Sequence, residues 1–300
     1  MKKWIQYGTI LSVIAGVAAG SGSASAAGSA AGQVYIDGSL QQGALIVNGR
    51  TLVQLRALDD PSWLTYSYDA KTKTVKAASK DKSKVIELKE GRKTALVNGK
   101  EVALDVSVVI QAGRTYVPLR FVGDNMGAYV SYNAAKKRTI VRTPKGQKDY
   151  DTLMKGDLEA ARTIAVHVPK YYPDGQLESQ GEGFSFTYLF PEGEALRFQT
   201  DYRQLTSDFV IDGDGIAEAV YQQYNPYGEK AVVKGTKPAD TGKAWYYFMN
   251  NFMSEYTWYG KIDVQGQDTR IADVSWAEHP EYKNKVIFPI EGEQRTDGKQ

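Results

Sequence analysis

The chain of 300 residues has no cysteine and only two histidines, His167 and His279. Without cysteine there are no disulfide bonds, thiolate metal ligands, cysteine nucleophile or lipid-modified cysteine. Two imidazoles also cannot supply a metal site that needs three histidines. We therefore expect domains held together by their cores alone, with no cofactor.

Long apolar runs are also missing, except at the N-terminus. Lys2 and Lys3 precede an apolar run over residues 4–19, and small residues follow as far as Ala26. This order is typical of a secretory signal peptide. We predict a signal peptide over residues 1–26 and a secreted protein, extracellular or cell-wall associated, with no stable membrane span after cleavage. The alternative is that the leader is retained as a membrane anchor.

The two halves of the chain carry opposite charge. Residues 1–149 contain 22 Lys and Arg against 11 Asp and Glu, a balance of +11, whereas residues 150–300 contain 15 against 24, a balance of −9. Most basic residues in such positions solvate a face or protect a sheet edge. Together they also create a field that attracts polyanions and that salt screens. Anionic cell-wall polymers or glycans are therefore candidate partners, and we expect no nucleic-acid partner.

The basic half contains two copies of one motif. Residues 48–68 align without a gap with residues 112–132, sixty-four positions later. In the second copy residues 114–117 favour a strand, Pro118 suits the first turn of a helix, and Gly127 accepts the left-handed conformation that ends one. The motif predicts a strand, a short helix and a strand. Since this unit cannot bury its apolar face alone, the second copy is expected to complete the core.

Tight turns join further strands in this half. Asp37-Gly38, Asn48-Gly49 and Asn98-Gly99 are dipeptides that accept positive φ in two-residue hairpins. Residues 139–141 favour a closing strand. The basic half is therefore expected to be a module of antiparallel strands with short helices.

Residues 97–133 resemble a known family. They contain Gly-Arg-Thr-Tyr-Val-Pro-Leu-Arg at residues 113–120 and Gly-Ala at residues 127–128. This arrangement is similar to the copper amine oxidase N-terminal domain, also called the stalk domain. The resemblance covers about residues 34–143 and implies such a domain, with two related copies, over residues 33–144.

The sequence departs from the family pattern in both copies. Tyr132-Asn133 replaces Trp-Asp, Ser107-Val108 replaces the usual prolines, and Gln54 in the first copy lacks the proline of the second. In a copper amine oxidase, three histidine ligands and a quinone-forming tyrosine lie in other domains. Both histidines of this chain lie outside the resembling region, so we predict no copper and no amine oxidation.

Two interpretations of the motif arginines Arg56 and Arg120 remain open. Each could pair with a carboxylate, Asp105 being one candidate, or cap carbonyls beside the short helix. Each could instead capture an anion. The motif positions that we single out are Arg56, Gly113, Arg114, Pro118, Arg120 and Gly127.

The acidic half favours an antiparallel α+β domain over residues 149–292, of a family that we do not recognise. Residues 145–148 predict a linker. Apolar residues at helical spacing predict a helix after Asp151, a candidate N-cap, which ends near His167, a surface or partly buried residue rather than a ligand. Alternating runs predict strands at residues 184–190, 195–199, 208–211, 216–221, 262–264 and 286–290, and the spacing of Trp245, Phe248, Phe252 and Tyr256 predicts an amphipathic helix. The whole chain is therefore of the α+β class.

Three carboxylates, Asp212, Asp214 and Glu218, form a weak candidate for a calcium site, because acidic loops with glycine wrap hard cations. Val210 occupies the first expected acidic position, and no glutamate stands at the spacing that an EF-hand needs. A plain turn over residues 212–215 is therefore favoured.

Aromatic residues are frequent in the acidic half. Thirteen of the twenty tyrosines lie at or after Tyr150, and Trp245, Trp258 and Trp276 accompany them. Such rings can stack on sugars or on choline-like cations. They are also ordinary strand and core residues. The three tryptophans are the candidate ligand platform.

The sequence favours a non-catalytic envelope protein, in which the repeated module is a scaffold or a docking unit for wall polymers and the acidic domain binds a ligand. No nucleophile elbow, phosphate loop or paired histidine motif is present. One alternative is a purely structural spacer. The other is a secreted glycan hydrolase that uses a pair of the carboxylates of the acidic half, namely Glu178, Glu182, Asp201, Asp208, Asp212 and Glu218.

Overall fold

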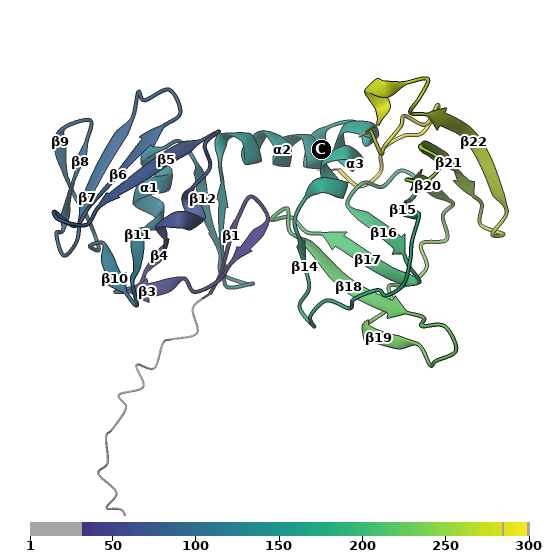
Figure 1. Cartoon of the computed structure of the whole chain (residues 1–300), viewed down its shortest axis with the longest axis horizontal. Coiled ribbons are helices and arrows are strands. Elements are labelled where there is room, and N and C mark those ends of the chain that lie inside the picture. Colours follow the sequence, from purple (N-terminus) through teal and green to yellow (C-terminus); the bar gives the residue numbers. More distant parts are fainter. Residues whose placement is uncertain (1–31, 284, 299–300) are drawn as a thin grey trace, which may run out of the picture.

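The computed structural model describes residues 32–283 and 285–298. The signal peptide predicted over residues 1–26 lies outside the described residues. Strands make up 44% of the described residues and helices 14%, which is a sheet-rich α+β fold. Two bodies lie side by side, joined by the helix α2 (Pro144–Lys155) (Figure 1). Within the described part, no helix has the length and apolarity needed to cross a membrane.

Three small sheets form the N-terminal body. The first has the order β12 (Tyr129–Asn133), β13 (Arg138–Arg142), β1 (Gln33–Ile36), β2 (Ser39–Gln41). The second has the order β10 (Val109–Gln111), β11 (Arg114–Pro118), β4 (Arg50–Gln54), β3 (Leu45–Val47). The third runs in chain order through β5 (Leu64–Asp69), β6 (Thr74–Ser79), β7 (Val85–Lys89), β8 (Thr94–Val97) and β9 (Lys100–Ala103). Two short helices, η1 (Leu55–Leu58) and α1 (Leu119–Asn125), follow β4 and β11.

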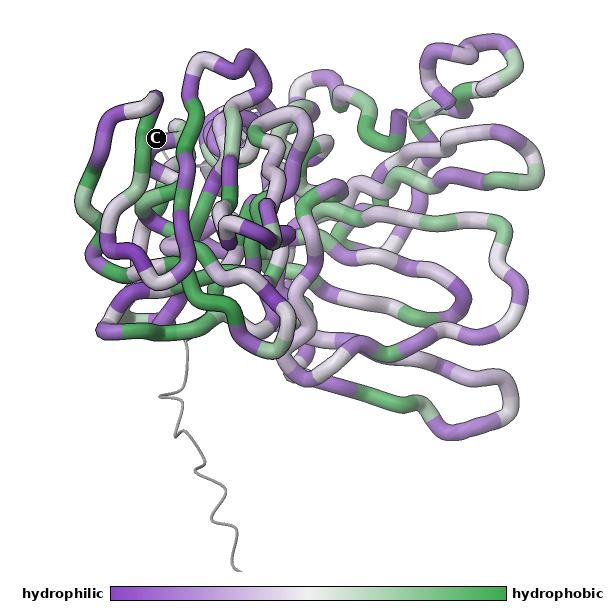
Figure 2. Tube along the Cα trace, turned by 60° about the vertical axis from the view of Figure 1, so that its left-hand side comes forward, coloured by the Kyte–Doolittle hydropathy of each residue, from purple (hydrophilic) through white to green (hydrophobic). Residues whose placement is uncertain are grey.

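The three predicted hairpin turns are present. Asp37-Gly38 joins β1 to β2, Asn48-Gly49 joins β3 to β4, and Asn98-Gly99 joins β8 to β9. Both residues of each pair have positive φ, for example 46° at Asp37 and 81° at Gly38. Two consecutive positive φ values define the hairpin turn that matches the twist of the strands. In Figure 2 apolar and hydrophilic segments alternate along the strands and hairpins.

The strands of the two motif copies pair with each other. In the antiparallel pair of β4 and β11, Val53 lies opposite Val117, the residue sixty-four positions later. The outer strands β3 and β10 pair with β4 and β11 at equivalent positions. Val53 and Val117 are 1% and 0% exposed, and the core beside them is largely aliphatic, with Leu119 and Val122 from α1. Gly127 follows α1 with φ of 77°, as predicted.

The region expected as a linker, residues 145–148, is helical, so that prediction was wrong. Thr143 accepts a hydrogen bond on Oγ1 from the backbone N–H of Gly146 at 3.0 Å, and Pro144 occupies the first turn, where a missing N–H costs nothing. Asp151 lies inside α2 and caps nothing. The second helix, α3 (Leu158–His167), begins after Asp157, whose side chain accepts from the N–H of Ala160 at 2.8 Å.

One sheet of nine strands dominates the C-terminal body (Figure 1). Its order is β14 (Lys170–Tyr171), β18 (Ala217–Tyr224), β17 (Leu205–Ile211), β16 (Arg197–Tyr202), β15 (Ser185–Pro191), β20 (Trp245–Asn251), β21 (Tyr256–Ile262), β22 (Asp268–Ser275), with β19 (Val232–Gly235) beside β18. Phe190, Phe198, Phe209 and Phe248 line its buried face and are at most 2% exposed. α3 supplies Ala165 and Val166 to the same core.

Three predictions in this body were wrong. Residues 262–264, expected as a strand, are the last residue of β21 and the start of the turn after it. The stretch expected as an amphipathic helix from Trp245 begins with a strand, β20, because alternate residues such as Tyr246 and Phe248 point into the core. Its aromatic residues satisfy both a helical spacing and a strand alternation, and pairing with two neighbouring strands favours the strand. Residues 286–290 form no strand, although Ile287 and Phe288 are buried in the core.

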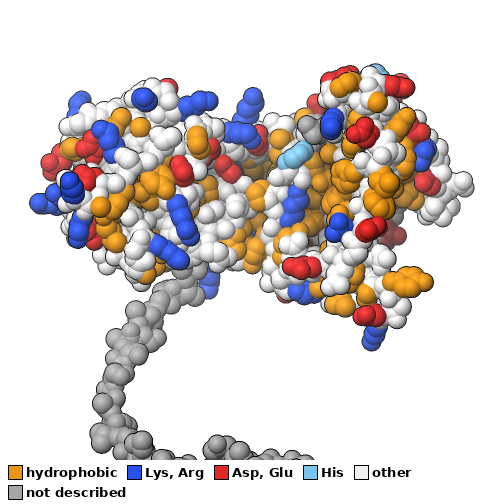
Figure 3. Space-filling view, in the orientation of Figure 1, with side chains coloured by type: hydrophobic (Ala, Val, Ile, Leu, Met, Phe, Trp, Pro, Cys, Tyr) orange, Lys and Arg blue, Asp and Glu red, His pale blue; other side chains and the backbone are white. Residues whose placement is uncertain are grey.

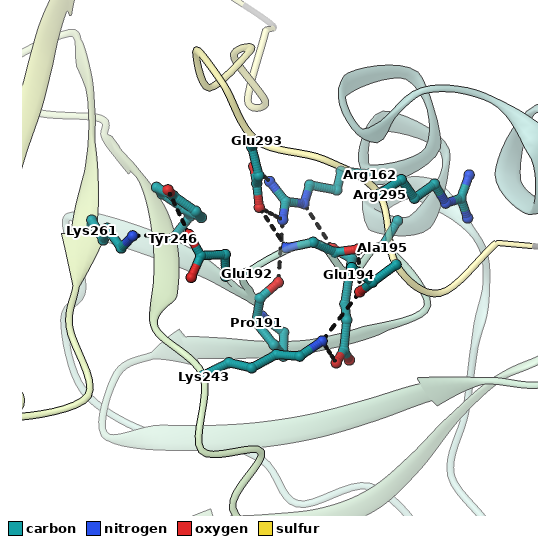
Figure 4. Close-up of polar contacts among 12 residues, drawn as sticks. Arg162, Pro191, Glu192, Glu194, Ala195, Lys243, Tyr246, Lys261, Glu293 and Arg295 are labelled. Atoms are coloured by element: carbon teal, nitrogen blue, oxygen red, sulfur yellow. Dashed lines mark hydrogen bonds and ion pairs between the residues drawn. The ribbon is translucent and has the colours of Figure 1, made fainter.

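A buried ion pair ties the C-terminal segment to α3 (Figure 4). Arg162 and Glu293 are joined by two hydrogen bonds of 2.7 and 2.8 Å, and their side chains are 1% and 2% exposed. Arg162 also donates to the carbonyls of Glu194 and Pro191, and Glu293 accepts from the N–H of Gly193. The guanidinium of Arg162 and the carboxylate of Glu293 thus form these hydrogen bonds within the C-terminal body. The pair is therefore a structural feature.

Candidate functional site

The three candidate calcium ligands lie where the two bodies meet. Asp212 and Asp214 occupy the turn between β17 and β18, as predicted, and Glu218 follows on β18. Oδ2 of Asp212 accepts from Lys136 at 2.6 Å and from Arg138 at 2.8 Å. Arg138 also donates to Glu218 at 3.0 Å. Asn133 donates to Asp214 at 2.7 Å.

Lys136 and Arg138 therefore occupy the space beside Asp212 and Glu218 in which a cation would have to bind. Burial alone would raise the pKa of Asp212, but the ammonium of Lys136 and the N–H of Ile216 lower it below its ordinary value. In the described part of the chain, no cluster of three or more His, Cys, Asp or Glu residues is arranged to hold a metal. The opposite charges of the two halves of the chain meet at this contact.

Trp245 and Trp258 lie on one face of the nine-stranded sheet, opposite its aromatic core. In the pair of β20 and β21, Trp258 is opposite Met249, while Trp245 is two strand positions beyond Tyr247 on the same face. Side chains alternate between the two faces of a strand. Trp276 does not join them: it is 8% exposed and donates its indole N–H to Thr257, which faces the core. We call the face with Trp245 and Trp258 the open face.

An arginine lies over each of these two rings. The guanidinium carbon of Arg197 is 5.9 Å from the ring centre of Trp245, and that of Arg270 is 4.8 Å from the ring centre of Trp258. Arg197 donates to the carbonyl of Ala239, and Arg270 pairs with Asp273. Arg197 comes from β16 and Arg270 from β22. Each arginine therefore meets its tryptophan only through the register of the sheet.

Tyr247 lies between the two tryptophans on the open face and packs over Gly260. A side chain at Gly260 would place its Cβ 2.5 Å from the hydroxyl of Tyr247 and 2.5 Å from the carbonyl of Thr269. Only glycine leaves room for this ring. Burial, followed by contact with Asp268, raises the pKa of Tyr247.

Two of the carboxylates considered for hydrolysis share the open face. Asp208 lies opposite Gln199, and Asp201 is two positions along β16, so the carboxylates are diagonal neighbours. Burial raises the pKa of both, although Gln199 offsets part of this at Asp208. The other four do not join them: Asp212 and Glu218 lie at the contact between the bodies, and Glu178 and Glu182 precede β15 in an exposed segment.

The motif arginines do not pair with Asp105. Asp105 accepts from Arg50 instead, at 2.7 Å. Within the range that the structure describes, the exposed side chains of Arg56 and Arg120 have no hydrogen-bond or ion-pair partner. The other motif positions are structural. Gly113 has φ of 70°, Pro118 ends β11 before α1, and Arg114 is an exposed strand residue.

A cavity of about 700 Å³ lies in the N-terminal body and is lined by residues of both copies. Arg50 and Thr51 come from the first copy, and Arg120 and Phe121 come from the second. A second cavity of about 510 Å³ lies at α2 and includes His167. His167 is the last residue of α3, as predicted, with Nδ1 2.7 Å from the carbonyl oxygen of Thr163.

Sequence reasoning missed Lys170, a half-buried residue near the aromatic core. Its ammonium donates to the carbonyl of Val166 at 2.5 Å and lies 5.6 Å from the ring centre of Phe198. Burial lowers its pKa to about 8. No sequence pattern distinguishes it from the surface lysines, because its burial depends on strands distant in the chain.

The comparison with protein families identifies the N-terminal body. Residues 32–141 match the family model described as copper amine oxidase N-terminal domain, which confirms the resemblance noted above. The match ends before α2. No curated protein matches the chain, and no solved structure does.

Proposed function

From the copper amine oxidase N-terminal domain at residues 32–141, we propose that the chain is an exported, non-catalytic binding protein of the cell envelope. The N-terminal domain is its scaffold and docking unit, and the C-terminal body binds a glycan or other wall polymer with acidic groups. The observation that carries this proposal is the open face, where Trp245 and Trp258 each lie beneath an arginine.

The chemistry of the open face supports an acidic ligand. A guanidinium stacked on an indole is held in place, while its edge can donate two parallel hydrogen bonds to a carboxylate or phosphate. Met249, which lies opposite Trp258, adds apolar surface, whereas Tyr247 is buried beside it. The face therefore offers separate positions for charge and for a flat ring.

The register of the N-terminal domain supports a scaffold made of two related copies. β4 and β11 are neighbours in one sheet and pair around Val53 and Val117, so the two copies contribute adjacent strands to one core. Basic side chains protrude around this body (Figure 3). A basic scaffold attached to a ligand-binding sheet suits a wall of anionic polymers.

Sedimentation of the purified chain with isolated cell walls tests this function. We expect sedimentation at low salt that decreases as salt screens the charges, and at least a tenfold loss when Trp245→Ala and Trp258→Ala are combined. The control is Tyr227→Ala, which removes a ring that is 96% exposed in the loop after β18. Equal sedimentation of the double variant and the control would exclude the open face.

A hydrolase remains the second candidate, because Asp201 and Asp208 are neighbours on the same face. Two carboxylates about 5–10 Å apart can act as acid and base or nucleophile on a glycosidic bond. Release of reducing ends from cell walls, abolished by Asp208→Asn, would favour this reaction over simple binding. Under the binding proposal, neither protein releases any.

A further inference from the structure

The two motif copies use equivalent residues differently. Arg56 and Arg120 occupy the same motif position, sixty-four residues apart, but only Arg120 lines the cavity of about 700 Å³. Asp60 and Asp124 are likewise equivalent, and only Asp124 lines it. The cavity is therefore a property of the second copy, although the first copy supplies one wall.

The aspartates show why the copies differ. Asp60 accepts from the N–H and the hydroxyl of Ser62, at 2.8 and 2.9 Å. The residue equivalent to Ser62 is Met126, which is buried and offers no hydroxyl. Asp124 consequently has no side-chain partner among residues 32–283 and 285–298. In the first copy, Asp60 stabilises a turn. In the second copy, the carboxylate of Asp124 is available to a ligand at the cavity.

The remaining lining combines polar groups with rings. The side-chain amide of Asn125 donates a hydrogen bond to the carbonyl of Phe121 at 2.8 Å. Its side-chain oxygen can therefore accept a hydrogen bond from a ligand. Tyr132, which is 56% exposed, and Phe121 both line the cavity. The ion pair of Arg50 and Asp105 also lines the cavity.

We propose that this cavity binds an acidic saccharide, that is, a sugar ring that carries a carboxylate. Arg120 binds the carboxylate through its paired N–H groups, since a guanidinium matches the two oxygens of that group. Asp124 and Asn125 accept hydrogen bonds from ring hydroxyls, and Tyr132 stacks on the flat face of the ring. The volume lies in the range of small-ligand sites.

An uncommitted carboxylate beside the arginine favours this ligand over a simple polyanion. Asp124 repels a chain of phosphates, whereas a sugar acid presents hydroxyl donors that Asp124 can accept. An apolar ligand would leave Arg120 and Asp124 desolvated without partners. This inference rests on the proposed docking role of the N-terminal domain, for which it names the site and the ligand class.

Isothermal titration of the full chain with tetragalacturonic acid tests the inference, with neutral tetragalactose and a glycerol phosphate oligomer as comparisons. We expect binding of the acid, at least tenfold weaker binding of the neutral sugar, and at least tenfold weaker binding by Arg120→Ala. The matched control is Arg56→Ala, with an expected change of less than twofold. A second matched pair is Tyr132→Ala against Tyr68→Ala.

Several outcomes would overturn the inference. These are no binding of the acid at millimolar concentration, equal effects of Arg120→Ala and Arg56→Ala, or tighter binding of the phosphate oligomer than of the sugar acid. Unchanged thermal unfolding of each variant shows that a loss of binding is local. The Trp245→Ala and Trp258→Ala double variant keeps this binding, so failure of wall sedimentation and failure of the cavity are distinguishable.

Discussion

The two bodies differ in how deeply they bury their ion pairs. The N-terminal body surrounds a largely aliphatic core with three small sheets and keeps ion pairs such as Arg50–Asp105 on its surface, with side chains 57% and 70% exposed. The C-terminal body has an aromatic core and buries Arg162–Glu293, with side chains 1% and 2% exposed. Because the cost of desolvation depends on burial, similar residue pairs should contribute very differently to the two bodies. The exposed charges of Arg50 and Asp105 are therefore accessible from solvent, whereas those of Arg162 and Glu293 are not.

The largest expected effect comes from breaking the buried pair. Glu293→Gln keeps the shape of the side chain but leaves the charge of Arg162 buried and unpaired, which should lower the free energy of unfolding by about 3–5 kcal/mol. Urea unfolding monitored by tryptophan fluorescence measures the change. Replacing both residues by methionine removes the unpaired charge and should restore much of the loss. A double variant no more stable than Glu293→Gln would contradict this explanation.

Lys170 gives the next largest effect, as a dependence on pH. Its folded pKa of about 8 lies below the ordinary 10.5, so between these values the unfolded chain binds more protons. Stability should therefore rise with pH, by about 2–3 kcal/mol between pH 7 and pH 10. Urea unfolding across this range measures the slope, and Lys170→Met should flatten it. Tyr35, with its pKa raised to about 12, affects stability only above pH 10. A slope that survives in Lys170→Met would assign it to other groups.

Local patterns in the sequence predicted much of the fold. The three hairpin turns follow from dipeptides such as Asn48-Gly49, whose positive φ is a local property. The strands of the second motif copy and those near residues 184–221 follow from alternation. The errors concern segments whose local sequence fits two kinds of secondary structure, such as the start of α2 and the aromatic run from Trp245. In these cases pairing or capping by other segments decides between the solutions.

The candidate sites were less predictable because they depend on register. Trp245 and Trp258 were expected to act together, but their common face follows from the pairing of β20 with β21. Trp276 was grouped with them by composition alone, and it faces the core. Arg120 was singled out by its motif. Its difference from Arg56 follows from the cavity, which only the folded arrangement places beside Arg120. The difference between Asp60 and Asp124 involves Ser62, which binds Asp60 in a turn.

The contact between the bodies should show an intermediate effect. Arg138→Leu removes hydrogen bonds to Asp212 and Glu218 and should cost about 1–3 kcal/mol. Scanning calorimetry would show the two bodies unfolding less cooperatively. Lys136→Met is the matched control, because its ammonium binds the same oxygen of Asp212 from a position that is 44% exposed. The control should have the smaller effect, and the reverse order would exclude burial as the cause.

The smallest effect is expected for the exposed pair of the N-terminal body. Asp105→Asn makes the same chemical change as Glu293→Gln, but water solvates both Arg50 and the new amide, so the free energy of unfolding should change by less than about 1 kcal/mol. That small difference should also shrink at high salt, since the pair is screened. Urea unfolding at low and high salt measures both. A loss comparable to that of Glu293→Gln would mean that burial does not separate the two bodies.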